Sequence, residues 1–115
     1  MKKYFLIFMI TLTSLPVHAV WLSTTAKVEH ITTYATTETV LVTLSKDGAD
    51  ITECSNKTAF AISKDLSSEA RSRMYSMLLS AQTTGRDVVV SYNDVGNCEP
   101  WGSNANAYRK IVRMW

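Results

Sequence analysis

A single amphipathic helix that runs directly into a strand is the feature that most constrains this fold. Between residues 66 and 81 the apolar side chains recur at helical spacing, and Gly85 is placed to end the helix in the left-handed conformation. The valine-rich segment 86–92 follows at once. A chain with one helix must bury this stripe against strands or offer it to a partner. The stripe consists of Leu66, Ala70, Met74, Met77, Leu78 and Ala81.

Most of the remaining chain has the composition of β-strands, rich in β-branched residues and bounded by turn residues. Asp47-Gly48 has the chemistry of a turn with positive φ. The segment 95–107 contains Gly, Asn and Pro, which predicts a long loop. The predicted strands are Ala26–Tyr34, Thr39–Ser45, Thr58–Ser63, 86–92 and 108–115.

The order of these elements is three strands, one helix and two strands. Five short strands cannot bury both faces as a flat sheet, but curling into a barrel hides the edges. The helix between strands 3 and 4 would then cover the open end of the barrel. We therefore predict a mainly β chain with one helix, folded as a five-stranded OB-fold barrel. The alternative is that the helical stripe binds a partner.

The N-terminal residues have the parts of a secretory signal peptide. Lys2 and Lys3 precede an apolar run that is too short to span a membrane comfortably, and Pro16 ends the run. Small residues around Ala19 fit a cleavage site. We predict a signal peptide at residues 1–19 and one domain at residues 20–115, exported to the periplasm or secreted. The alternative is an uncleaved anchor, and no other stretch is apolar enough to cross a bilayer.

The charge of the chain limits its possible partners, and its two cysteines predict a disulfide. Lys2 and Lys3 account for the whole excess of 12 basic over 10 acidic residues. The predicted mature domain is therefore neutral, which disfavours nucleic acid and anionic membranes as partners. In an exported chain Cys54 and Cys98 most simply form one disulfide, worth roughly 4 kcal/mol in the chain-entropy model. Two free thiols are the alternative.

The sequence contains no pattern typical of an enzyme. His30 is the only histidine after residue 19, so neither a hydrolytic triad nor a zinc site has the groups it requires. Phosphate-binding and dinucleotide-binding glycine motifs are absent from the sequence. We therefore expect no catalytic residue, no metal and no cofactor.

Aromatic and hydroxyl residues lie together just before the first predicted strand. Trp21 is followed by Ser23, Thr24 and Thr25. Hydroxyl groups can bond the polar rim of a sugar while an aromatic ring covers its apolar face. This arrangement indicates a sugar-binding site, and the alternative is an N-terminal arm that only packs on the barrel.

Three short sequence patterns also resemble those of a known family. The runs are "VWLS", "ITECSNK" and "TTGRDVVVSY", in this order along the chain. Together with the order of elements, the two cysteines and the export signal, they resemble the B subunits of pertussis-like toxins, and among them that of subtilase cytotoxin. The similarity covers about two-thirds of residues 20–115.

The resemblance implies a secreted OB-fold subunit that forms a homopentamer and binds sialylated glycans on host cells, with an enzymatic A subunit as a possible partner. It implies a glycan pocket with a hydroxyl residue near the first strand and a tyrosine at the end of the fourth. These positions fall on Thr25, with Ser23 or Thr24 as alternatives, and on Tyr92. The competing hypothesis is a monomeric periplasmic OB-fold protein that binds another protein or stabilises the envelope.

Overall fold

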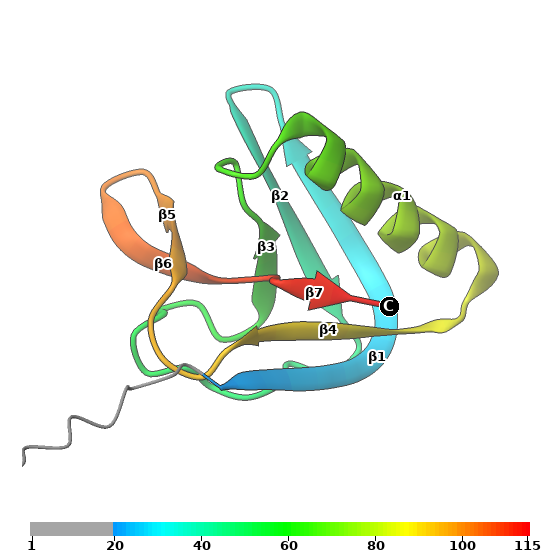
Figure 1. Cartoon of the computed structure of the whole chain (residues 1–115), viewed down its shortest axis with the longest axis horizontal. Coiled ribbons are helices and arrows are strands. Elements are labelled where there is room, and N and C mark those ends of the chain that lie inside the picture. Colours follow the sequence, from blue (N-terminus) through cyan, green and yellow to red (C-terminus); the bar gives the residue numbers. More distant parts are fainter. Residues whose placement is uncertain (1–19) are drawn as a thin grey trace, which may run out of the picture.

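The computed structural model describes residues 20–115, and the predicted signal peptide at residues 1–19 lies outside them. The described chain is mainly β with one helix between the third and fourth strands, as predicted (Figure 1). There are seven strands in place of the five expected. The elements are β1 (Trp21–Tyr34), β2 (Thr37–Leu44), β3 (Ala59–Ile62), α1 (Ser68–Thr84), β4 (Asp87–Asn93), β5 (Cys98–Trp101), β6 (Asn104–Lys110) and β7 (Arg113–Met114).

The seven strands form one sheet in the order β5-β6-β3-β2-β1-β4-β7. Strand β1 is long because it has two partners: residues 21–27 pair with β4, and the half from Val28 to Tyr34 pairs with β2. It therefore begins at Trp21, earlier than the predicted Ala26. Residues 21–25 were expected to precede the strand, and the pairing with β4 extends it through them.

The prediction for residues 95–107 was wrong, because part of the expected loop forms strands. Strands β5 and β6 pair as an antiparallel hairpin, with Cys98 opposite Arg109. The predicted final strand is also divided into β6 and β7. Strand β6 lies parallel to β3, and β7 lies antiparallel to β4. Between them, the N–H of Ile111 donates to a carbonyl of β3 and the N–H of Val112 donates to a carbonyl of β4.

Helix α1 packs its predicted apolar stripe against the strands. Leu78 and Ala81 are fully buried, and Met74, Met77 and, just before the helix, Leu66 pack on the same core. The Ser67 side chain accepts a hydrogen bond from the Ala70 N–H and caps the N-terminus. Gly85 ends the helix with φ +70°, as its position in the sequence predicted.

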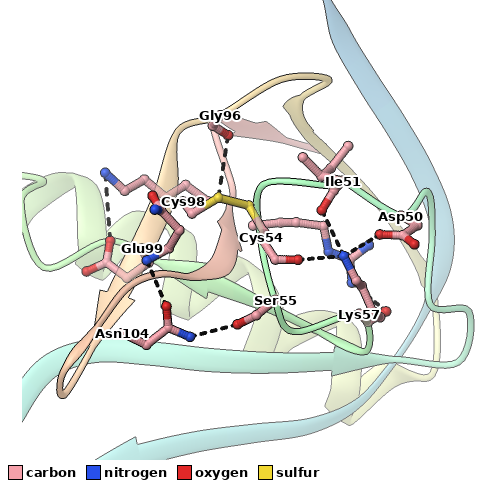
Figure 2. Close-up of a disulfide and its surroundings, with 12 residues drawn as sticks. Asp50, Ile51, Cys54, Ser55, Lys57, Gly96, Cys98, Glu99 and Asn104 are labelled. Atoms are coloured by element: carbon pink, nitrogen blue, oxygen red, sulfur yellow. Dashed lines mark hydrogen bonds and ion pairs between the residues drawn. A yellow bond between two sulfur atoms is a disulfide. The ribbon is translucent and has the colours of Figure 1, made fainter.

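Cys54 and Cys98 form the predicted disulfide, which joins the connection between β2 and β3 to strand β5 (Figure 2). Next to it, the Lys57 ammonium donates to the carbonyls of Ile51 and Cys54 and pairs with Asp50. The connection, residues 45–58, has no regular strand or helix but is fixed by these contacts. We call it the β2–β3 loop.

Candidate functional site

Strand alternation places the predicted glycan-binding residues on two different faces. Ser23 and Thr25 are exposed on the outer face of β1, opposite Ser91 and Val89 of β4. Thr24 lies between them and points into the protein. The structure therefore brings Ser23 and Thr25 together on one surface and places Thr24 behind it.

Tyr92 lies in the interior beside Thr24. Its side chain is 1% exposed, and its hydroxyl lies 2.7 Å from Thr24 Oγ1 and accepts from the Ala49 N–H at 2.8 Å. Gly48, at φ +73°, lies so close that a Cβ there would come within 2.6 Å of Thr24 Oγ1. This geometry suits an anchor for the β2–β3 loop, and a glycan could not contact Tyr92 without displacing that loop.

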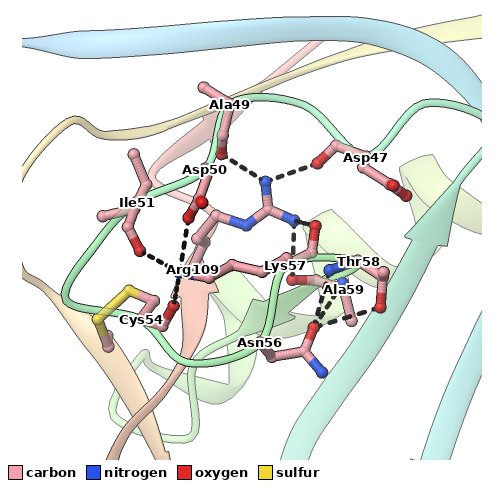
Figure 3. Close-up of polar contacts among 11 residues, drawn as sticks. Asp47, Ala49, Asp50, Ile51, Cys54, Asn56, Lys57, Thr58, Ala59 and Arg109 are labelled. Carbon is pink, nitrogen blue, oxygen red and sulfur yellow. Dashed lines mark hydrogen bonds and ion pairs between the residues drawn. A yellow bond between two sulfur atoms is a disulfide. The ribbon is translucent and has the colours of Figure 1, made fainter.

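A buried arginine completes the interior polar cluster. The guanidinium of Arg109 lies 3.9 Å from the centre of the Phe60 ring and 5.6 Å from that of Tyr92. Burial lowers the pKa of Arg109, while nearby Tyr92 and acids of the loop act in the opposite direction. Its terminal nitrogens donate to four backbone carbonyls (Figure 3). The acceptors are Asp47 at 2.6 Å, Ala49 at 2.8 Å, Lys57 at 3.1 Å and Ala59 at 3.4 Å.

A second arginine, Arg113, lies on the outer face between two exposed tryptophans. Its guanidinium is 5.1 Å from the Trp21 ring centre and 4.5 Å from that of Trp115. These rings are 50% and 52% exposed. Within residues 20–115, the Arg113 side chain has no hydrogen bond or ion pair to the protein. Trp21 was a candidate from the sequence, whereas Arg113 and Trp115 were not, because they are distant from it in sequence.

The strand register explains why these groups meet. Arg113 lies opposite Ser91, and Ser91 lies opposite Ser23, so all three side chains point to the same face. The backbone of Trp115 bonds to Val89 in both directions, which places Trp115 in the row of Thr25. We call this face the outer surface. It comprises Trp21, Ser23, Thr25, Val89, Ser91, Asn93, Arg113 and Trp115.

The polar groups of the outer surface differ in availability. Ser91 is fully buried beneath its neighbours, and its hydroxyl lies 2.9 Å from the Ser23 hydroxyl. Ser23 and Thr25 are exposed, and Arg113 is exposed with its donors free of protein acceptors within the described chain. The surface thus offers aromatic area, hydroxyl groups and an uncompensated cation. This chemistry suits a ligand with apolar C–H groups, hydroxyls and a carboxylate.

A metal-ligand cluster and a membrane-spanning helix are both absent from residues 20–115. No group of three potential metal-ligating side chains is found there. None of the helices in that range has the length and apolar character needed to cross a membrane. Comparison with known proteins finds no matching family model, curated protein or solved structure.

Proposed function

We propose that this protein is a glycan-binding module of the toxin-B-subunit type, which recognises acidic sugars through its outer surface. The observation that carries the proposal is the stack of Trp21, Arg113 and Trp115 on the face that also exposes Ser23 and Thr25. The resemblance to pertussis-like toxin B subunits suggested sialylated host glycans, and an exposed arginine supplies a partner for their carboxylate.

Each component of this surface has a separate role in the proposed binding. Arg113 donates to the carboxylate, and a guanidinium can do so with two parallel hydrogen bonds. The rings of Trp21 and Trp115 cover C–H faces of the sugar. Ser23 and Thr25 bond its hydroxyls. Thr24 and Tyr92 act from behind, because they hold the β2–β3 loop and the inner side of β1 in place.

The same proposal includes the closed five-stranded OB-fold barrel. In it, β6 and β7 count as one bent fifth strand, and β5 is an added hairpin strand. Three observations support the bent fifth strand. Strand β6 pairs in parallel with β3, β7 pairs antiparallel with β4, and Ile111 and Val112 bond to these two strands. Helix α1, which contacts β1, β3 and β4, would then cover one end of the barrel.

We also propose that the module forms a homopentamer, with an enzymatic A subunit as a possible partner. Weak single sugar sites gain avidity when several lie on one rigid assembly. Light scattering of the purified, oxidised protein tests this directly. A mass near five subunits supports the ring, and a monomer removes the multivalent part of the proposal.

An observation on α1 favours the alternative, a monomeric periplasmic protein that binds another protein. Tyr75 and Leu79 are 37% and 44% exposed, one helical turn apart, and the sequence from Met74 to Thr84 has no charged residue. A solvent-facing helix is usually more polar than this. A glycan-binding assay distinguishes the two functions, because only the toxin-B-type module is expected to bind glycans.

An array of sialylated glycans and their desialylated counterparts tests the function. We expect retention on the sialylated members and little on the neutral ones, and we expect Arg113→Gln to abolish this preference. Arg86→Gln is the matched control, because Arg86 is an exposed arginine that precedes β4 and is not one of the outer-surface residues. Equal retention on both sets of glycans would contradict the proposal.

A further inference from the structure

A second aromatic site lies at the other end of β1 from Trp21. Three connections converge there: the β1–β2 turn, the β3–α1 connection and the β5–β6 turn (Figure 1). Residues in and next to these connections line an open groove of about 270 Å³, and we call it the Trp101 groove. Its lining residues are Thr36, Thr37, Lys64, Pro100, Trp101 and Gly102.

The aromatic wall of this groove is held in place by two neighbours. The Trp101 ring centre lies 4.9 Å from that of Tyr34 and 5.7 Å from that of Tyr108, both in edge-type contacts. Such contacts between aromatic rings are favourable beyond the area they bury. Trp101 remains partly exposed and is therefore a supported surface on which a ligand can lie without reordering the wall.

A buried carboxylate, that of Glu99, positions the backbone of Lys64 at the edge of the groove. Glu99 is fully buried, and its Oε1 accepts from the Thr39 hydroxyl at 3.0 Å and from the Lys64 N–H at 3.3 Å. Its other oxygen has no hydrogen-bond donor and lies 4.0 Å from the Lys110 ammonium. Glu99 thereby fixes the backbone of Lys64 beside the strand that carries Trp101.

Two polar residues that line the groove, Lys64 and Thr36, have side chains available to a ligand, whereas the Thr37 hydroxyl is bonded to Thr39. The Lys64 side chain is exposed, and within the described residues its ammonium has neither a hydrogen bond nor an ion pair. Lys64 is also the only charged residue among those that line the groove. Thr36 adds an exposed hydroxyl. The groove therefore combines a supported indole, a free cation and a hydroxyl.

We propose that the Trp101 groove is a second binding site, for a single sugar unit that carries a carboxylate. The sugar ring lies against Trp101, Lys64 donates to the carboxylate, and Thr36 bonds its hydroxyls. The volume is slightly below the range of pockets for drug-sized ligands, roughly 300–1,000 Å³, which suits one sugar unit. The groove shares no residue with the outer surface, so this proposal does not depend on the proposed function of that surface.

The three tryptophans allow a direct test, because each contributes one indole N–H signal to a nitrogen–proton NMR spectrum. Trp101 reports the groove, and Trp21 and Trp115 report the outer surface. We would titrate the labelled protein with glucuronic acid and, for comparison, with glucose. We expect the Trp101 signal to move in a saturable way with glucuronic acid, and to move much less with glucose.

Two single variants assign the effect. Lys64→Gln should weaken the response of Trp101 at least fivefold, because the only cation of the groove is lost, and its fold should be unchanged because the ammonium has no protein partner. Lys46→Gln, which removes another exposed lysine, is the matched control and should leave the response unchanged. Arg113→Gln should also leave the Trp101 response unchanged.

The outcomes separate this site from the proposed function. If Trp21 and Trp115 respond while Trp101 does not, the groove proposal is overturned and the outer surface keeps its function. A Trp101 response that Lys64→Gln does not weaken also overturns the groove proposal. If only Trp101 responds, the groove is supported and the outer surface is not.

Discussion

Two arginines four positions apart, Arg109 and Arg113, lie in contrasting environments. Each guanidinium lies over two aromatic rings. Arg109 is 1% exposed and donates to four backbone carbonyls of the loop and strand around it. Arg113 is exposed on the outer surface and, within the described residues, has no protein acceptor.

The difference shows how one side-chain chemistry serves two purposes. A buried cation is tolerated only where acceptors replace water, and the terminal nitrogens of Arg109 have four, while its buried Nε has none among the described residues. Those acceptors belong mainly to the β2–β3 loop, so Arg109 acts on the conformation of the protein. The N–H donors of Arg113 face solvent, so a ligand can accept hydrogen bonds from them without breaking contacts that stabilise the fold. We therefore expect substitutions around Arg109 to change stability and substitutions around Arg113 to change binding.

The largest expected effect comes from the disulfide that restrains the β2–β3 loop. Replacing Cys54 and Cys98 together by serine should lower the free energy of unfolding by about 4 kcal/mol, because the bridge joins residues 44 positions apart. Urea unfolding of the oxidised protein and the double variant measures the difference. An unchanged midpoint would show that the loop is held by its other contacts alone.

Arg109→Gln should have the next largest effect. A shorter neutral side chain cannot reach all four carbonyls, and a buried polar group left without its partner costs roughly 1–3 kcal/mol. We expect a loss of about 3 kcal/mol in the same unfolding experiment. If Arg109→Gln were as stable as the parent, the carbonyl contacts would not be what fixes the loop.

Tyr92→Phe tests the interior cluster more finely. The substitution removes the hydroxyl that bonds Thr24 and the Ala49 N–H, and should cost roughly 1–2 kcal/mol. Thermal unfolding measures this loss. If Tyr92 belongs to the glycan pocket, as the family resemblance implies, the same variant should bind glycans more weakly. If Tyr92 is only a buried anchor, the affinity should be unchanged. A folded Tyr92→Phe variant that no longer binds glycans would show that Tyr92 contributes to glycan binding.

Arg113→Gln should have the smallest effect on stability. An exposed cation over aromatic rings contributes about 0.5–1 kcal/mol, and within residues 20–115 no hydrogen bond or ion pair of this side chain is lost. The free energy of unfolding should therefore fall by less than about 1 kcal/mol. A loss as large as that of Arg109→Gln would mean that the two arginines are equivalent structural elements.

The sequence predicted the elements whose residues carry a local signal. The stripe from Leu66 to Ala81 and the glycine at position 85 located the helix, alternation located β2, and the run of valines located β4. Strand β5 and the first part of β6 were missed because their pairing depends on tertiary contacts, including the bridge at Cys98, and their composition is that of a loop. The early part of β1 was missed because only its register with β4 makes it a strand.

The candidate site was predictable only in part. Trp21, Ser23 and Thr25 are close in sequence, so their shared chemistry was visible. Arg113 and Trp115 join them only through the pairing of β7 with β4, which no local pattern reveals. Thr24 was selected with its neighbours as a hydroxyl near Trp21, and Tyr92 was selected by resemblance. Their burial follows from strand alternation once the start of β1 is known.

The most direct test of the outer surface is calorimetric titration of the parent and Arg113→Gln with a sialylated trisaccharide and its neutral counterpart. We predict that the parent binds the sialylated sugar and that Arg113→Gln binds it at least tenfold more weakly, with little change in unfolding temperature. Equal affinity of the two proteins for the sialylated sugar would contradict the assignment of the outer surface as the glycan site.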